Sequence, residues 1–385
     1  PAGTSNKATV QARGLGIGGV LVGRLAANAD LIGGRGTVKA SLSGQRGRLF
    51  DLQGEADVEP DRIWVAARGT IDKRPIRLTR RAVFTPSADG WRLSPTTISY
   101  AGGSLQLGGE LSGMTTSIEG RMQKLPLSLL DIAYDNLGLG GTATGSLSYV
   151  HTRGAMPTGK AELRVRGLSR SGLSLSSRPV DAGVNAVLTR DRLAARMLFA
   201  AEGQTIGRAQ VLLMPLGSEG GLIERLNRAP LFGQLRYRGT ADTLWRLTGV
   251  EIVDIAGPVS VSADARGTLG NPVIAGSLAT DNAAISSAVT GMRLHNVKAR
   301  GRFSGAQLVM SSFSANAQNG GTVTGTGRFT VAGIGGVGMD LRLQAENAAL
   351  LQRDDIPATV TGPITLKSDG SGGTIGGDLL LNRSR

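Results

Sequence analysis

The chain has 385 residues, of which 58 are glycine and only 4% are aromatic, and its formal net charge is +14. Many glycines with few large side chains are typical of short strands joined by tight turns rather than of a globule with an aromatic core. The absence of cysteine excludes a disulfide framework and a thiolate metal site.

Alternating apolar and polar residues recur along the chain. In residues 259–265, Val259 and Val261 fall on one face and Ser260 falls on the other. This period of two is the pattern of a β-strand. Glycine, asparagine and proline between such runs, as in residues 270–272, indicate turns. The sequence therefore predicts an all-β fold.

A glycine-rich phrase also repeats, and it stands at residues 102–109, 140–147, 320–325 and, in a shorter form, 376–379. Repetition on this scale is typical of an extended, solenoid-like sheet, in which each unit buries its apolar face only against its neighbours. The irregular spacing disfavours a short-period β-helix. We expect continuous repetitive β-structure over residues 1–385. Within it we expect three weakly separated subdivisions, at residues 1–155, 156–245 and 246–385.

Three stretches break the alternation and predict short helices that decorate or plug the sheet. Residues 125–132 are too densely apolar for a half-buried strand. Residues 222–226 have apolar side chains at helical spacing, and residues 242–247 begin with Asp242, a plausible helix cap.

Basic side chains occupy the face opposite the apolar ones, as Arg164 and Arg166 do beside Leu163 and Val165. The simplest interpretation is a solvated outer face. The alternative is attraction to anionic lipid headgroups or other polyanions. The three tryptophans are isolated, so stacking of nucleic-acid bases is disfavoured.

Several short motifs match catalytic or cofactor sites only in part. Residues 154–161 resemble a phosphate-binding loop, but Ala161 replaces the hydroxyl residue and a strand pattern follows. The G-x-G-x-x-G matches at residues 14–19 and 333–338 are expected by chance in so glycine-rich a chain, and neither opens a convincing helix. Residues 335–340 resemble a single calcium-binding nonapeptide that is not repeated in tandem.

Titratable side chains form no recognisable catalytic set. His151 and His295 are far apart and lack spaced acidic partners, so no metal site can be assembled from them. Asp354 and Asp355 precede a proline and indicate a turn rather than an acid/base pair. We expect a protein that is not an enzyme and uses no metal or cofactor.

The phrases at residues 267–278, 291–297 and 319–327, in that order, resemble the repeats of the TamB family within the AsmA-like group. A weaker copy at residues 156–163 accounts for the false phosphate loop. No run reaches the ~18–20 apolar residues of a membrane-spanning helix, and no signal segment is recognisable. We therefore expect an internal to C-terminal-proximal segment of a longer protein, with its membrane anchor elsewhere.

The resemblance implies a long curved sheet, a trough of the β-taco-like type with an apolar lining. It also implies phospholipid transport between the inner and outer membranes, and support of outer-membrane protein assembly and secretion with the outer-membrane barrel protein TamA. The expected location is the periplasm, anchored to the inner membrane. We expect the contacts with TamA to lie outside this segment.

The alternation predicts which apolar residues line the trough: Leu105, Leu107, Leu163, Val165, Val259, Val261, Val323, Leu341 and Leu343. A register error of one residue would turn a strand's whole set outward. Two other interpretations stay open at this point. One is a closed β-solenoid, as in adhesins or autotransporter passengers, and the other is a scaffold that offers strand edges to outer-membrane proteins in transit.

Overall fold

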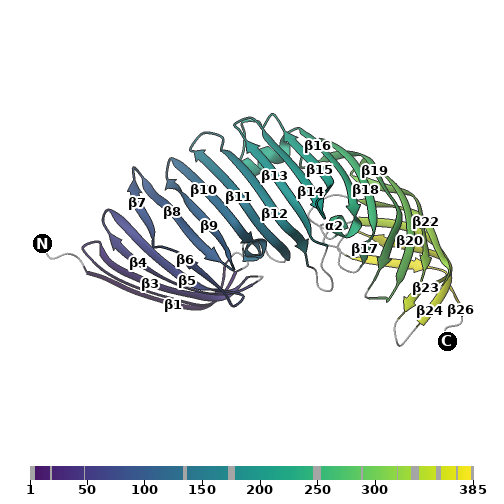
Figure 1. Ribbon diagram of the computed structural model, residues 1–385, viewed down its shortest axis with the longest axis horizontal. Coiled ribbons are helices and arrows are strands. Elements are labelled where there is room, and N and C mark those ends of the chain that lie inside the picture. Colours follow the sequence, from purple (N-terminus) through teal and green to yellow (C-terminus); the bar gives the residue numbers. More distant parts are fainter. Residues whose placement is uncertain are drawn as a thin grey trace. The chain divides into compact units, whose positions relative to one another are not determined.

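Figure 1 shows the chain as a computed structural model. The structure describes residues 5–17, 20–46, 48–132, 137–171, 178–245, 253–287, 289–318, 320–330, 338–352, 357–369 and 372–382. The chain forms two compact units. Unit 1 contains residues 1–168 and 181–191, and unit 2 contains residues 169–180 and 192–385.

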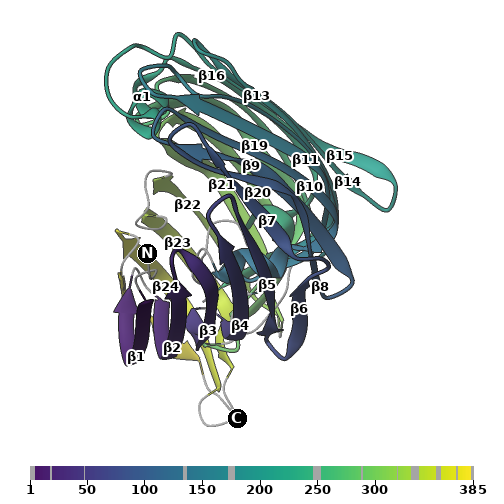
Figure 2. The same cartoon turned by 90° about the vertical axis from the view of Figure 1, so that its left-hand side faces the viewer.

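Unit 1 is a series of antiparallel strands. They are β1 (Ser5–Ile17), β2 (Val20–Ile32), β3 (Arg35–Arg46), β4 (Arg48–Glu59), β5 (Arg62–Ile71), β6 (Arg74–Leu78), β7 (Ala82–Ser87), β8 (Gly90–Tyr100), β9 (Gly103–Ser112), β10 (Thr115–Pro126), β11 (Leu139–Thr152), and most of β12 (Thr158–Arg170) and of β13 (Val180–Leu188). From β1 to β5 each strand pairs with the next one in the chain, and Figure 2 shows them edge to edge. Both β6 and β7 lie between β5 and β8.

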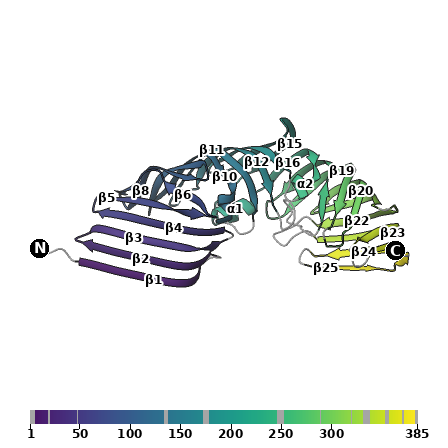
Figure 3. The same ribbon diagram turned by 60° about the horizontal axis from the view of Figure 1, so that its bottom comes forward.

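Unit 2 continues the same pattern. Its strands are β14 (Leu193–Ala201), β15 (Gln204–Leu213), β16 (Leu231–Thr240), β17 (Asp254–Ala256), β18 (Pro258–Gly267), β19 (Pro272–Ser286), β20 (Arg293–Gly305), β21 (Gln307–Ala317), β22 (Thr322–Thr330), β23 (Gly338–Gln352), β24 (Pro357–Ser368), β25 (Gly373–Gly377) and β26 (Leu380–Asn382). Register shifts interrupt the β19–β20, β20–β21, β21–β22 and β23–β24 ladders. Because bulges bend and twist a sheet, the strands turn progressively from β15 to β25 (Figure 3).

Several strand pairs are joined by two-residue turns in which both residues have positive φ. Gly33 and Gly34 connect β2 to β3 with φ values of 57° and 77°. Glu202 and Gly203 connect β14 to β15 in the same way, with φ values of 52° and 79°. Turns of this kind match the right-handed twist of the flanking strands, so they fix the register of each hairpin.

The described residues contain three helices, which fall where the breaks in alternation predict them. They are the 3-10 helix η1 (Leu127–Ile132), α1 (Leu222–Arg228) and α2 (Ala241–Trp245). Residues 246 and 247 of the predicted third helix lie outside the described residues. The structure is 77% strand and 5% helix, so the predicted all-β fold, a curved sheet with a few short helices, is confirmed. The predicted boundaries of the subdivisions near residues 155 and 245 stay a prediction.

Candidate functional site

The apolar face of unit 1 carries the four lining residues predicted there. Leu105 and Leu107 on β9 and Leu163 on β12 are half-buried, and Val165 is buried. Leu107 lies opposite Gly120 of β10 in the ladder. A Cβ atom added at Gly120 would lie 3.1 Å from Cγ of Leu147 and 3.5 Å from Cδ2 of Leu107, so these side chains converge over the glycine.

Exposure changes steeply along this face. Tyr100, at one end of β8, is 1% exposed, whereas Trp91 at the other end is 40% exposed. The register with β9 places both on the same face, with Leu111 opposite Trp91 and 68% exposed. The apolar face of unit 1 is therefore covered at one rim and accessible at the other.

The covered rim lies under η1. Leu129 and Ile132 of this helix pack against a cluster formed by Phe50, Ile71 and Tyr100. A helix between β10 and β11 thus lies on apolar side chains from β4, β5 and β8. This contact joins segments that are distant in the chain, and no local sequence pattern signals it.

An ion-pair network fixes η1 in this position. Arg48 Nε donates a hydrogen bond to Oδ2 of Asp131 at 2.8 Å, and Arg48 Nη1 pairs with Asp72. Asp131 is only 5% exposed. Burial lowers the pKa of the Arg48 guanidinium, but the hydrogen bonds with Asp72 and Asp131 outweigh this effect and raise it above its usual value.

In unit 2, Val259 and Val261 are buried and pack with Tyr237 and Ala241. Ala241 begins α2, so this short helix covers part of the apolar face, as η1 does in unit 1. The hydroxyl of Tyr237 donates a hydrogen bond to the carbonyl oxygen of Thr240 at 2.8 Å. Burial raises the pKa of this tyrosine, and its hydrogen bonds oppose the shift.

The last three predicted lining residues lie on the same face of neighbouring strands. Val323 on β22 is 1% exposed, Leu341 on β23 is buried, and Leu343 is half-buried. They pack in two adjoining clusters whose members are alanine, valine, leucine, isoleucine, methionine and phenylalanine. On β9, Leu105 and Leu107 share their face with the exposed Leu111, and Gln106 on the other face is exposed too. The structure places the other seven predicted residues on the less exposed face of their strands, two in unit 1 and five in unit 2. Contact of the nine residues with lipid stays a prediction.

The opposite face of unit 2 is basic. Arg208 of β15 lies directly opposite Arg236 of β16, and Arg236 pairs with Asp264 at 2.8 Å. Arg302 and Arg342 are also exposed on this face. Like charges directly opposite one another are unfavourable, and Asp264 offsets this repulsion.

Residues of the partial motifs do not form a site. Residues 154–157 form a turn that leads into β12, so no helix follows the phosphate-loop match. His151 lies on β11 and His295 on β20. Residues 18, 19, 331–337, 354 and 355, which include parts of the other motifs, lie outside the described residues. Within the described residues, no group of three or more His, Cys, Asp or Glu side chains could hold a metal ion.

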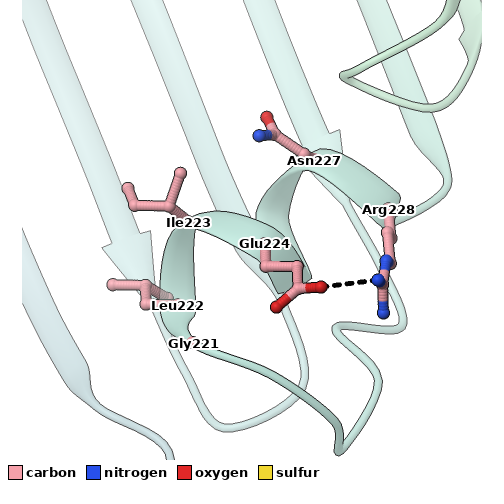
Figure 4. A pocket seen from close by; sticks show the side chains of 6 residues that line it. All are labelled: Gly221, Leu222, Ile223, Glu224, Asn227 and Arg228. Atoms are coloured by element: carbon pink, nitrogen blue, oxygen red, sulfur yellow. Dashed lines mark ion pairs between the residues drawn. The ribbon is translucent and has the colours of Figure 1, made fainter.

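A pocket of about 540 Å³ lies beside α1 (Figure 4). Its lining includes Leu222, Ile223 and Asn227, and an ion pair of 2.5 Å between Glu224 and Arg228 crosses one side. Ile223 is largely exposed. None of the predicted lining residues contributes to this pocket.

These features define a class of protein that is built from curved antiparallel sheets with one apolar face and one charged face. Residues 311–385 match the TamB family, described as the TamB C-terminal domain. This match is consistent with a TamB segment near the C-terminus and suggests involvement in the translocation and assembly module of the cell envelope. The family is a non-enzymatic component of transport and assembly.

The matched region runs from within β21 to the end of the chain and contains Val323, Leu341 and Leu343. The similarity covers 75 of the 385 residues. Comparison with curated proteins gave no significant match, and comparison with solved structures gave none either. In the described part of the chain, no helix has the length and apolarity needed to cross a bilayer.

Proposed function

We propose that this chain carries phospholipid between the inner and outer membranes, with acyl chains held on its apolar face. The observation that supports this most directly is the segregation of side chains on neighbouring strands. Leu341 and Leu343 lie on the less exposed face of β23, while Arg342 between them is exposed. Each buried CH₂ group gains roughly 0.8 kcal/mol, so such a face can hold an acyl chain without a specific polar site.

The proposed setting is the periplasm, with an inner-membrane anchor in a part of the protein beyond this chain. There the protein would support outer-membrane biogenesis and the assembly and secretion of proteins, with TamA as its outer-membrane partner. The match of residues 311–385 to the TamB C-terminal domain supports this setting. The sequence-based expectation that TamA contacts lie elsewhere stays a prediction.

Lipid mass spectrometry on the chain purified from the periplasm tests the proposal. The test variant is Val261→Asp with Leu343→Asp, which places two carboxylates on the apolar face. The matched control is Ser262→Asp with Gln344→Asp, one residue further along each strand and on the opposite face. We expect phospholipid with the wild type and the control, and a marked loss with the test variant.

Absence of phospholipid from well-folded wild-type protein would contradict the proposal. That result would favour a closed β-solenoid or a scaffold for outer-membrane proteins. Equal phospholipid in the test variant and the control would also contradict it, because lipid held on the apolar face must respond to charge there.

A further inference from the structure

The turn between β19 and β20 makes a contact that the pairing of neighbouring strands does not require. The backbone N–H of Gln352, at the end of β23, donates a hydrogen bond to the carbonyl oxygen of Thr290 at 2.8 Å. The turn is itself held by a hydrogen bond of 2.9 Å from the N–H of Gly291 to the carbonyl oxygen of Ser287. β20 and β23 are separated by β21 and β22, so the sheet of unit 2 curls back on itself at this rim.

Gly291 is the residue that permits this approach. Its φ is +71°, and a Cβ atom at this position would overlap the carbonyl oxygen of Gln352 and lie 2.7 Å from its carbonyl carbon. Gly305, which ends β20 before the next turn, has a similar φ of +64°, but a Cβ atom there would meet nothing within 4 Å. The two glycines therefore share the same backbone requirement, and only Gly291 is also needed for a close contact.

Apolar residues near this contact are fully buried. Ala345 and Ala348 of β23 are both 0% exposed, and Met292 and Leu350 pack against the cluster that contains them. Towards the other end of β23, Leu341 is buried and Met339 is half-buried. Ala345 and Ala348 therefore offer no surface to hydrocarbon in this state.

We propose that the Thr290–Gln352 contact is a clasp that controls access of hydrocarbon to the apolar face of β20–β24. This inference rests on the proposed function, since it assumes that acyl chains use the face. One backbone hydrogen bond contributes modestly to stability, so the clasp opens without unfolding of the unit. Gly291 then acts as a positioning residue that lets the clasp close.

The test compares Gly291→Ala with Gly305→Ala, which impose the same backbone strain but differ in the close contact. Amide hydrogen exchange at Gln352 reports the clasp, and uptake of the fluorescent hydrocarbon diphenylhexatriene reports access. For Gly291→Ala we expect exchange at Gln352 to be about tenfold faster and probe uptake to increase, with both unchanged in Gly305→Ala. The chain has no cysteine, so Thr290→Cys with Gln352→Cys adds a single disulfide, which should lower uptake until it is reduced.

Two outcomes overturn the clasp in different ways. If all three proteins (the wild type, Gly291→Ala and the oxidised double-cysteine variant) take up the probe to the same extent, the clasp does not control access. That result leaves the proposed function intact. No uptake by any of them, with faster exchange at Gln352 in Gly291→Ala, refutes the clasp together with the proposed function. The disulfide variant keeps the test valid if Gly291→Ala fails to fold, which far-ultraviolet circular dichroism would show.

Discussion

Val323 and Thr324 are adjacent on β22 and differ in the face that they occupy. Val323 is 1% exposed in the cluster of alanine, valine and leucine side chains, whereas Thr324 is exposed. A carboxylate at position 323 would be buried without a basic partner in that cluster, and an unpaired buried charge is strongly unfavourable.

We therefore predict that Val323→Asp lowers the free energy of unfolding by about 3–5 kcal/mol, while Thr324→Asp changes it by less than about 0.5 kcal/mol. Urea unfolding followed by circular dichroism measures both. Equal effects of the two substitutions would show that β22 has no preferred buried face.

Tyr237 gives a prediction about pH. Its pKa is raised by burial, so the folded protein keeps the phenol proton at pH values where the unfolded chain has lost it. The free energy of unfolding should therefore fall as pH rises above about 10, the usual pKa of tyrosine, and this residue should contribute no slope below that range. Tyr237→Phe should give a shallower alkaline slope in urea titrations. An unchanged slope would exclude the phenol as its source.

At the scale of single residues, the period of two predicts much of the burial pattern. It puts Val323 and Leu341 inside and Arg342 outside because successive side chains of a strand point to opposite faces. It does not predict that Ala345 and Ala348 have no exposed surface. Their burial depends on packing against side chains of other strands, among them Leu294 of β20 and Val360 of β24, which lie apart from them in the sequence.

At the scale of secondary-structure elements, η1 depends on its ion pair with β4. Asp131 accepts a hydrogen bond from Arg48, and Arg48 is itself only partly exposed. We predict that Asp131→Asn costs about 1.5–3 kcal/mol, the range for a hydrogen bond to a charged group. Exposed ion pairs contribute little, so Asp61→Asn, which breaks the exposed pair with Arg62, should leave stability unchanged.

Urea unfolding of both variants measures this difference, and a double-mutant cycle with Arg48→Met isolates the pair from other effects. A coupling energy near zero between positions 48 and 131 would mean that packing of Leu129 and Ile132, rather than the ion pair, holds η1 in place.

The sequence predicts where the three described helices lie in the chain, but it does not predict which residues they pack against. Dense apolar runs and helical spacing mark residues 125–132, 222–226 and 242–247 because these patterns cannot be half-buried strands. The partners of η1 are not predictable in this way. Arg48 and Asp131 are 83 residues apart. Arginine and aspartate are common on protein surfaces, so neither residue by itself indicates a buried ion pair.

At the scale of the whole molecule, most pairings join strands that follow one another in the chain, as β20 to β24 do. In such arrays stability is close to a sum of local terms. We predict that Val323→Asp accelerates amide exchange in β21–β23 and leaves exchange in β2–β4 unchanged. Hydrogen-exchange mass spectrometry measures this, and a uniform loss of protection would indicate that the chain unfolds in one cooperative step.

Repetition and alternation predict the all-β class, but not the curvature of the sheet. Curvature depends on where bulges fall, such as the register shift between Ala345 and Ala348 in the β23–β24 ladder. A bulge inserts a single residue and leaves the composition of a strand almost unchanged. The division of the chain into two units likewise has no linker or change of composition to mark it.

The succession of hairpins also has a consequence for how the chain acquires its structure. Strands that pair with their immediate neighbours close short loops, which costs less chain entropy than closing long ones. Each hairpin can therefore form as soon as its second strand is available, before the rest of the chain is complete. The Arg48–Asp131 and Thr290–Gln352 contacts span much longer separations, so we expect them to form after the hairpins that they connect.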